Sequence, residues 1–250
     1  MIHSFLLIGQ SNMAGRGLIS EAIDVDKAHI KILRNGRWQK MFRPINPDRR
    51  TSGVCLAESF AEKYAATHGV DVGLIPCADG GSQIARWAPG SLLFDNAVYQ
   101  ARLAMRTSHI VGILWHQGES DCYDNRYLTY QQSLSVMLTE LRKELNLWDV
   151  PLLLGGLGDY LDQYEGAHDQ MQWRLINQHI QAVADSDPMY GFVPADGLTP
   201  NPDNLHFSAA ALHEFGLRYY EAFEKLHDPN KVFVEKTIQD DALRTEMDPL

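Results

Sequence analysis

Residues 5–15 read FLLIGQSNMAG, an apolar run that stops at a glycine and passes at once into a polar turn. The run Phe5–Ile8 predicts a short buried strand, because it is apolar, brief and bounded by Gly9. The residues after Gln10 predict the start of a helix. A strand that turns directly into a helix displays the turn at the carboxyl edge of an open α/β sheet, where ligands bind. Ser11 is therefore either a displayed nucleophile or an N-cap, and this stretch alone leaves both interpretations open.

Short apolar runs and longer amphipathic stretches alternate along the rest of the chain. The runs predict five strands, at Ser4–Ile8, Val70–Cys77, Ile110–Trp115, Pro151–Gly155 and Met189–Val193. The stretches with helical spacing are Leu56–Thr67, Ala97–Thr107, Tyr127–Leu145, Gln170–Ala184 and Ser208–Leu226. This alternation indicates βαβ units and a mostly parallel sheet. The region from His29 to Asn46 differs, because Asn35-Gly36 between extended residues predicts a hairpin insertion.

The length of 250 residues and the ordinary globular composition predict one sizeable domain with a well-buried core. We place this domain at residues 1–228. Residues 229–250 are charged and weakly periodic, so they are predicted to form a C-terminal tail or an added helix.

The formal net charge of −10 argues against a non-specific nucleic-acid binder, which needs clustered Lys and Arg. The sequence has no apolar run long enough to span a membrane and no signal-peptide pattern. We therefore expect a cytoplasmic protein without a membrane partner. The three cysteines form no CxxC pair, which favours neither a zinc framework nor a disulfide scaffold. The oligomeric state stays open.

Polar turns follow each of the first three predicted strands. They read GQSNMAG at residues 9–15, CADGGSQIARW at 77–87 and WHQGESD at 115–121. Because the carboxyl ends of parallel strands share one edge of a sheet, these turns can converge. Each turn has an ordinary structural interpretation by itself, as a tight glycine turn, a packed histidine or a helix cap. Three in succession favour a functional site.

A fourth stretch, NPDNLHFSAAAL at residues 201–212, precedes the last predicted helix. Asp203 and His206 are three residues apart, a spacing that lets a carboxylate reach imidazole Nδ1 while Nε2 faces the sheet edge. This arrangement would hold a general base toward a serine. The alternative is that Asn204 or Ser208 caps the helix and His206 only packs.

These four blocks together resemble the SGNH-hydrolase superfamily. The combination of GQSNMAG, ADGGSQIARW, HQGESD and DNLHFS is similar to the sialate O-acetylesterase-like branch, which includes the acetylxylan esterases of carbohydrate esterase family 6. The resemblance implies a flavodoxin-like three-layer α/β/α sandwich with a central, mostly parallel five-stranded sheet. It also implies a serine esterase that removes O-acetyl groups from small acetylated carbohydrates, with no metal and no cofactor.

The resemblance also implies roles for particular residues. Ser11 matches the nucleophile, His206 the general base and Asp203 its orienting acid. The oxyanion hole would consist of the N–H groups of Ser11 and of Gly80 or Gly81, with Gly80 preferred, and the side-chain amide of Gln117. Glu119 would be an accessory carboxylate, and Trp87 would offer a stacking face to a sugar.

Two alternatives compete with a carbohydrate acetylesterase. The same triad could serve a lipase, thioesterase or other esterase that acts on non-sugar esters. A decayed, non-catalytic carbohydrate-binding relative is the other, and it would lack a triad residue, whereas Ser11, Asp203 and His206 are all present. The choice among acetylated xylo-oligosaccharides, sialic acids and other acetylated glycosides stays open.

Overall fold

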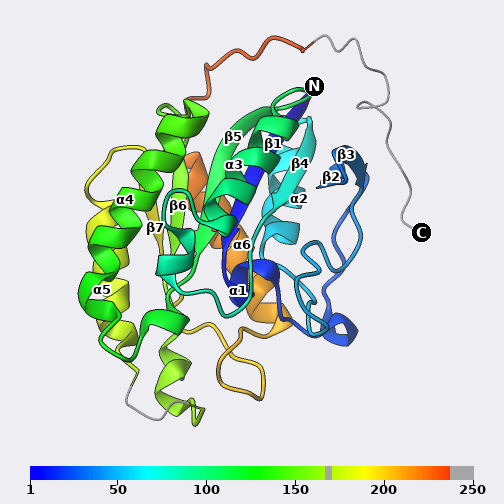
Figure 1. Cartoon of the computed structure of the whole chain (residues 1–250). Helices are drawn as coiled ribbons and strands as arrows, with labels where there is room; N and C mark the ends of the chain where they lie inside the picture. Colours follow the sequence, from blue (N-terminus) through cyan, green and yellow to red (C-terminus); the bar gives the residue numbers. More distant parts are fainter. Residues whose placement is uncertain (167–170, 237–250) are drawn as a thin grey trace.

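The structure, a computed structural model, describes residues 1–166 and 171–236. A single seven-stranded sheet in the order β3-β2-β4-β1-β5-β6-β7 forms its centre (Figure 1). The strands are β1 Ile2–Gly9, β2 Ile30–Arg34, β3 Arg37–Lys40, β4 Asp71–Pro76, β5 His109–His116, β6 Leu152–Gly155 and β7 Tyr190–Val193. All neighbouring strands pair in parallel except β2 and β3.

The five strands expected from the apolar runs are β1, β4, β5, β6 and β7. Numbered in chain order, these five lie in the spatial order 2-1-3-4-5, which is the flavodoxin-like arrangement. The predicted α/β fold is therefore confirmed. In such a sheet the ligand crevice opens where the strand order reverses, beyond the carboxyl ends of β1 and β5.

The sheet has seven strands rather than the five expected, because the predicted hairpin insertion joins it. Asn35 and Gly36 both have positive φ, 51° and 73°, which suits the two-residue turn between β2 and β3. β2 then pairs in parallel with β4, through Ile30–Ile32 against Val72–Leu74. Ile30 and Ile32 are buried by this pairing, so the insertion extends the sheet instead of standing apart from it.

Helices cover both faces of the sheet and make the three layers visible in Figure 1. The α-helices are α1 Ser11–Ala14, α2 Ala57–His68, α3 Leu92–Ala104, α4 Tyr127–Leu145, α5 Trp173–Ala184 and α6 Ala209–Glu224. Short 3-10 turns lie at Ile19–Glu21, Ile84–Trp87, Glu119–Asp121 and Asp159–Gln163. The helices α2 and α6 pack together on one face, whereas α3, α4 and α5 follow one another on the other.

Aromatic side chains join β1 to the layer of α2 and α6. Phe5 of β1 meets Phe60 of α2 and Phe223 of α6 edge-on, with ring centroids 4.7 Å and 5.6 Å apart. All three rings are buried. Truncating such a ring to alanine costs about 3–5 kcal/mol in proteins generally. This packing fixes the two helices against the strand that leads to Ser11.

The described part of the expected tail runs without helix or strand after α6. Phe233 packs against His3 and His109, with ring centroids 4.8 Å and 5.1 Å apart, at the amino ends of β1 and β5. Residues 237–250 of that tail lie outside the described residues, so the division at residue 228 stays a prediction. Across 1–166 and 171–236, no helix is both long and apolar enough to cross a membrane.

Candidate active site

The turn after β1 is built around a glycine that no other residue can replace without strain. Gly9 has φ of +134°, and a Cβ there would lie 2.0 Å from the carbonyl oxygen of His116. The close approach lets Gln10 donate its backbone N–H to the same oxygen at 2.9 Å. Ser11 is then the first residue of α1 rather than its N-cap, because the N-cap is Gln10. Since α1 has four residues, its dipole contributes little, and the backbone N–H of Ser11 has no acceptor inside the helix.

Asp203, His206 and Ser11 form a hydrogen-bonded relay at this edge. Oδ2 of Asp203 accepts from Nδ1 of His206 at 2.7 Å, and Nε2 of His206 lies 3.0 Å from Oγ of Ser11. A carboxylate can only accept, so the ring proton is assigned to Nδ1 and Nε2 is left to accept from the serine hydroxyl. The three residues therefore have the geometry of a nucleophile, a base and an orienting carboxylate.

The carboxylate of Asp203 is held as an anion. Partial burial acts to raise its pKa, but hydrogen bonds from the His206 side chain and from the N–H groups of His206 and Leu205 together outweigh this and lower the pKa. Oδ1 accepts both N–H groups at 3.0 Å. The side chain of Asp203 is 48% exposed against 18% for His206, so water reaches the carboxylate more easily than the imidazole.

Asn12 clamps the backbone on both sides of His206. Its Oδ1 accepts from the N–H of Phe207 at 3.1 Å, and its Nδ2 donates to the carbonyl of Leu205 at 3.3 Å. The same Nδ2 donates to Oε1 of Glu119 at 2.5 Å. Glu119 thus contacts Asn12 rather than Ser11, which makes it a candidate positioning residue for the histidine.

His116 completes the buried layer beneath Glu119. Nε2 of His116 lies 3.1 Å from the carbonyl of Gly156, and Nδ1 lies 3.8 Å from Oε1 of Glu119. Burial lowers the pKa of His116, although the Glu119 carboxylate and the Gly156 carbonyl oppose the shift. We therefore infer a neutral imidazole with its proton on Nε2, and an unprotonated Nδ1 facing Glu119.

Gln117 follows β5 at the expected edge of the sheet, but its side-chain amide donates to acceptors within the protein. The side chain is fully buried, and its Nε2 donates to Oδ2 of Asp121 at 2.6 Å, to the carbonyl of Ser82 at 2.9 Å and to Oε1 of Gln10 at 3.2 Å. With its donors so engaged, this amide is not free to reach an oxyanion. Gln117 instead connects the turns that follow β1, β4 and β5.

Asp121 reinforces the same connection. Its Oδ2 also accepts the backbone N–H of Ile84 at 2.8 Å. Burial raises the pKa of Asp121, and the hydrogen bonds from Gln117 and Ile84 partly offset the rise. Gln117 and Asp121 therefore set the position of the loop that carries Gly80 and Gly81.

The preference for Gly80 over Gly81 as an oxyanion donor is also corrected. The N–H of Gly80 donates to Oδ2 of Asp48 at 2.7 Å, and a Cβ on Gly80 would lie 2.4 Å from Arg16. Gly81 has φ of +72° and is exposed, and its N–H has no acceptor within the part of the chain that the structure describes. Gly81 is thus the glycine whose donor remains available.

An ion pair between Arg16 and Asp48 holds Gly80 in this orientation. Arg16 donates from both terminal nitrogens to the two oxygens of Asp48, at 3.0 Å and 2.8 Å, and both side chains are at most 6% exposed. Burial alone would raise the pKa of Asp48, but Arg16, Ser52 and the N–H of Gly80 together lower it. A bidentate pair of this kind fixes geometry as well as charge.

The prediction that Trp87 offers a stacking face to a sugar is wrong. The indole is 1% exposed, packs edge-on against Trp115 at 5.5 Å and donates its N–H to Ser82 at 3.0 Å. A ring buried on this scale supports the loop from inside and cannot meet a substrate.

Sequence reasoning missed the residues that support the triad. Asn12 directly follows Ser11 in the first block, so its position could have been noted, but nothing in the sequence indicates that it reaches the segment around His206. Arg16 and Asp48 belong to no motif, and they lie 32 residues apart in the sequence. Their pairing depends on the chain path and could not be found from local pattern.

The chain is similar to known proteins in sequence and in fold. A family model described as "Carbohydrate esterase, sialic acid-specific acetylesterase" matches residues 1–225. A probable carbohydrate esterase of Arabidopsis thaliana is 29% identical over 245 residues, which cover 88% of this chain and 89% of the plant protein.

Solved structures give the same fold. A crystal structure from Arabidopsis thaliana superposes with a TM-score of 0.79 at 26% identity, covering 89% of this chain and 98% of the other. A carbohydrate acetylesterase from Xanthomonas citri gives 0.67 at 18% identity, covering 90% and 56%. The structure of NanS gives 0.63 at 19% identity, covering 90% and 97%. The last two likenesses concern the fold alone.

Proposed function

The chain belongs to the carbohydrate esterase family of sialic acid-specific acetylesterases, and on that premise we propose that it removes O-acetyl groups from small acetylated carbohydrates through an acetyl-enzyme on Ser11. The observation that carries the proposal is the relay from Asp203 through His206 to Ser11, at 2.7 Å and 3.0 Å. These distances are within the range expected for a nucleophile, its base and the group that orients the base.

The first half of the reaction forms the acetyl-enzyme. Nε2 of His206 takes the proton of the Ser11 hydroxyl while Oγ attacks the acetyl carbonyl carbon. The tetrahedral intermediate then collapses, the bond from the carbonyl carbon to the sugar oxygen breaks, and His206 returns the proton to that oxygen. The Asp203 anion stabilises the imidazolium that exists between the two transfers.

The second half repeats these steps with water. His206 takes a proton from water, the hydroxyl attacks the acetyl-enzyme, and Ser11 leaves with the proton returned by His206, so that acetate is released. We assign the backbone N–H groups of Ser11 and Gly81 to the oxyanion in both halves, since Gly80 and Gln117 donate elsewhere. A donor aimed at the developing charge contributes roughly 3–4 kcal/mol in enzymes where it has been removed.

Acetate release from a panel of acetylated sugars tests the proposal. The panel contains O-acetylated sialic acids, acetylated xylo-oligosaccharides and peracetylated simple glycosides, with 4-nitrophenyl acetate and longer 4-nitrophenyl esters beside them. The wild-type chain should release acetate from at least one sugar, and Ser11→Ala should lose at least about a thousandfold in rate while keeping its melting temperature.

A matched control is His29→Ala, because His29 also pairs with a carboxylate, Asp71, at 2.9 Å but lies at the other end of the sheet. This control should keep wild-type turnover. Wild-type turnover by a folded Ser11→Ala variant would remove Ser11 as nucleophile. Hydrolysis of long acyl esters without any acetate release from sugars would instead favour the non-sugar esterase.

A further inference from the structure

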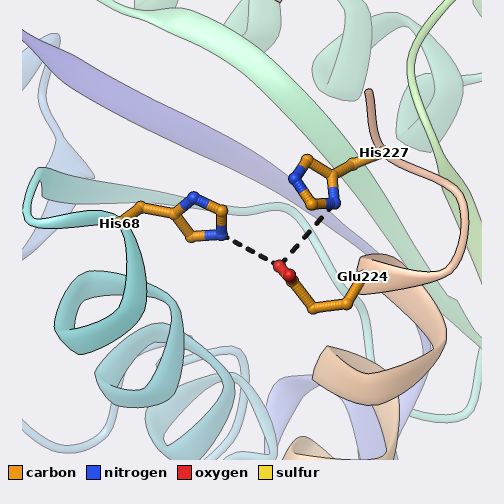
Figure 2. Close-up of side chains that lie close together, drawn as sticks. All are labelled: His68, Glu224 and His227. Carbon is orange, nitrogen blue, oxygen red and sulfur yellow. Dashed lines mark hydrogen bonds and ion pairs between the residues drawn. The ribbon is translucent and has the colours of Figure 1, made fainter. Parts of the chain in front are cut away.

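A second group of chemically active side chains lies at the amino end of the sheet. His68 is the last residue of α2, Glu224 is the last residue of α6, and His227 follows in the turn after α6. Figure 2 shows the two imidazoles converging on the Glu224 carboxylate from two directions. Nε2 of His68 lies 2.9 Å and Nδ1 of His227 lies 3.7 Å from Oε1 of Glu224.

We propose that His68, Glu224 and His227 form a binding site for a divalent transition-metal ion, with zinc as the preferred ion. Two imidazoles and one carboxylate are a donor set that zinc takes in proteins, with a fourth position left for water. The three ligand atoms lie within 4.8 Å of one another.

The spacing of these atoms suits a metal ion. Bonds of about 2.1 Å in a tetrahedral site separate the ligand atoms by about 3.4 Å. The two measured separations from Glu224, 2.9 Å and 3.7 Å, lie on either side of this value. Movements of about an ångström in the side chains would complete the geometry, and no backbone rearrangement is needed.

Both imidazoles are held in place before any ion arrives. The ring of His68 stacks on Tyr64 at 4.1 Å, and the ring of His227 stacks on Phe223 at 5.1 Å. Restricting the rings in this way lowers the entropy that binding would cost. Nδ1 of His227 is buried and has no hydrogen-bond partner in the described chain. A buried nitrogen of this kind gains a partner when it binds a metal.

The site would act as a structural link rather than as a catalytic centre. Glu224 and His227 share the last turn of α6 and the residues after it, and His68 ends the neighbouring helix, so an ion would join α2 to α6. The strand β1 starts near this end, where His3 contacts Tyr64 at 2.7 Å, and has its other end beside Ser11. Eight residues at about 3.3 Å each separate the two ends by roughly 26 Å, too far for the ion to touch an ester at Ser11.

Zinc titration of the chelator-stripped, full-length protein tests the proposal. Calorimetry with zinc chloride should show one saturable site in the wild type, and a hundredfold excess over the dissociation constant should raise the melting temperature by about 5 °C or more. Glu224→Gln keeps the shape and the hydrogen bond to His68, so it should fold, yet it should weaken zinc binding at least about tenfold. His227→Ala should do the same.

Two controls keep the result interpretable. His29→Ala, which removes a surface histidine–carboxylate pair, should bind zinc like the wild type, and His206→Ala tests whether the ion instead occupies the relay around Ser11. Loss of binding in His206→Ala with binding retained in Glu224→Gln would overturn the proposal. Equal, weak binding by all variants, or no saturable binding by the wild type, would overturn it as well.

Discussion

Two histidine–carboxylate pairs at opposite ends of the sheet, Asp203 with His206 and Glu224 with His68, differ in what faces them. At the carboxyl edge, Asp203 and His206 are 2.7 Å apart and the second ring nitrogen faces the hydroxyl of Ser11. At the amino edge, Glu224 and His68 are 2.9 Å apart and the carboxylate faces a second imidazole, that of His227. The two pairs thus differ in the third group beside them, a hydroxyl at one edge and an imidazole at the other, and we expect this group to determine the chemistry of each pair.

The two pairs also differ in the residues that surround them, which are polar around one pair and aromatic around the other. Around His206 the backbone is clamped by Asn12, which is itself hydrogen-bonded to Glu119. The neighbouring loops are joined through Gln117 and Asp121. Around His68 and His227 the contacts are made by aromatic rings. Polar clamps hold atoms at specific distances, whereas the stacked rings fix the two imidazole planes and leave one nitrogen of each directed at Glu224.

The largest expected effect comes from removing the imidazole at the carboxyl edge. His206→Ala should lower kcat for acetate release by at least about a thousandfold, because within residues 1–166 and 171–236 no base other than His206 is hydrogen-bonded to the Ser11 hydroxyl. His29→Ala removes a pair at the amino edge and should leave kcat unchanged. Steady-state kinetics with a melting curve for each variant measures both. A His206→Ala variant that keeps a tenth of the wild-type rate would contradict the assignment.

A smaller loss is expected for Asp203→Asn. The amide can present N–H groups to Nδ1 of His206, which favours the tautomer that carries its proton on Nε2 and cannot accept from serine. Since Asp203 is 48% exposed, water can partly replace it, and we expect a loss of about a hundredfold in kcat. The measurement is kcat with KM beside it. An unchanged kcat would mean that the carboxylate does not orient the base.

The clamp around His206 predicts a third, more moderate effect. Glu119→Gln keeps the size of the side chain but removes the negative charge that accepts from Asn12, so His206 should be held less firmly and kcat should fall about tenfold with little change in KM.

Glu58→Gln is the matched control, because Glu58 is also buried and pairs with Arg43 at 2.7 Å, away from the relay. It should lower the melting temperature without lowering kcat. If both variants lose only stability, Glu119 has no positioning role.

The smallest effect concerns the amino edge and appears in stability. Burial, with His109, His68 and the N-terminus nearby, lowers the pKa of His3 from 6.5 to about 4. Between these values the unfolded chain binds a proton that the folded chain does not, so His3 destabilises the fold as pH falls from 6.5 toward 4. His3→Gln should therefore lose less stability than the wild type over this range. Melting temperatures at pH 7.5, 5.5 and 4.5 check it, and parallel curves for the two proteins would refute it.

The fold, and the hydrogen bond between Asp203 and His206, could be predicted from the sequence because both follow from local sequence pattern. Each strand of the parallel core is an apolar run with buried side chains on both faces, so hydrophobic pattern alone locates it. The turns after β1, β4 and β5 share an edge by topology, which is why Ser11 and the glycine loop were expected together. The spacing of Asp203 and His206 is local, and their hydrogen bond needs only a turn.

Only the tertiary structure determined which hydrogen-bond donors and side chains are free to contact a substrate. Contacts between segments far apart in the chain determine whether Gln117 donates to Asp121 or to an oxyanion. They also determine which glycine, Gly80 or Gly81, has an unengaged N–H and whether Trp87 is exposed. The same holds at the amino edge, where the sequence shows Glu224 and His227 three residues apart but gives no sign of His68, 156 residues before Glu224. Sequence pattern reports local periodicity and burial, whereas the direction of a side-chain donor is determined by long-range packing.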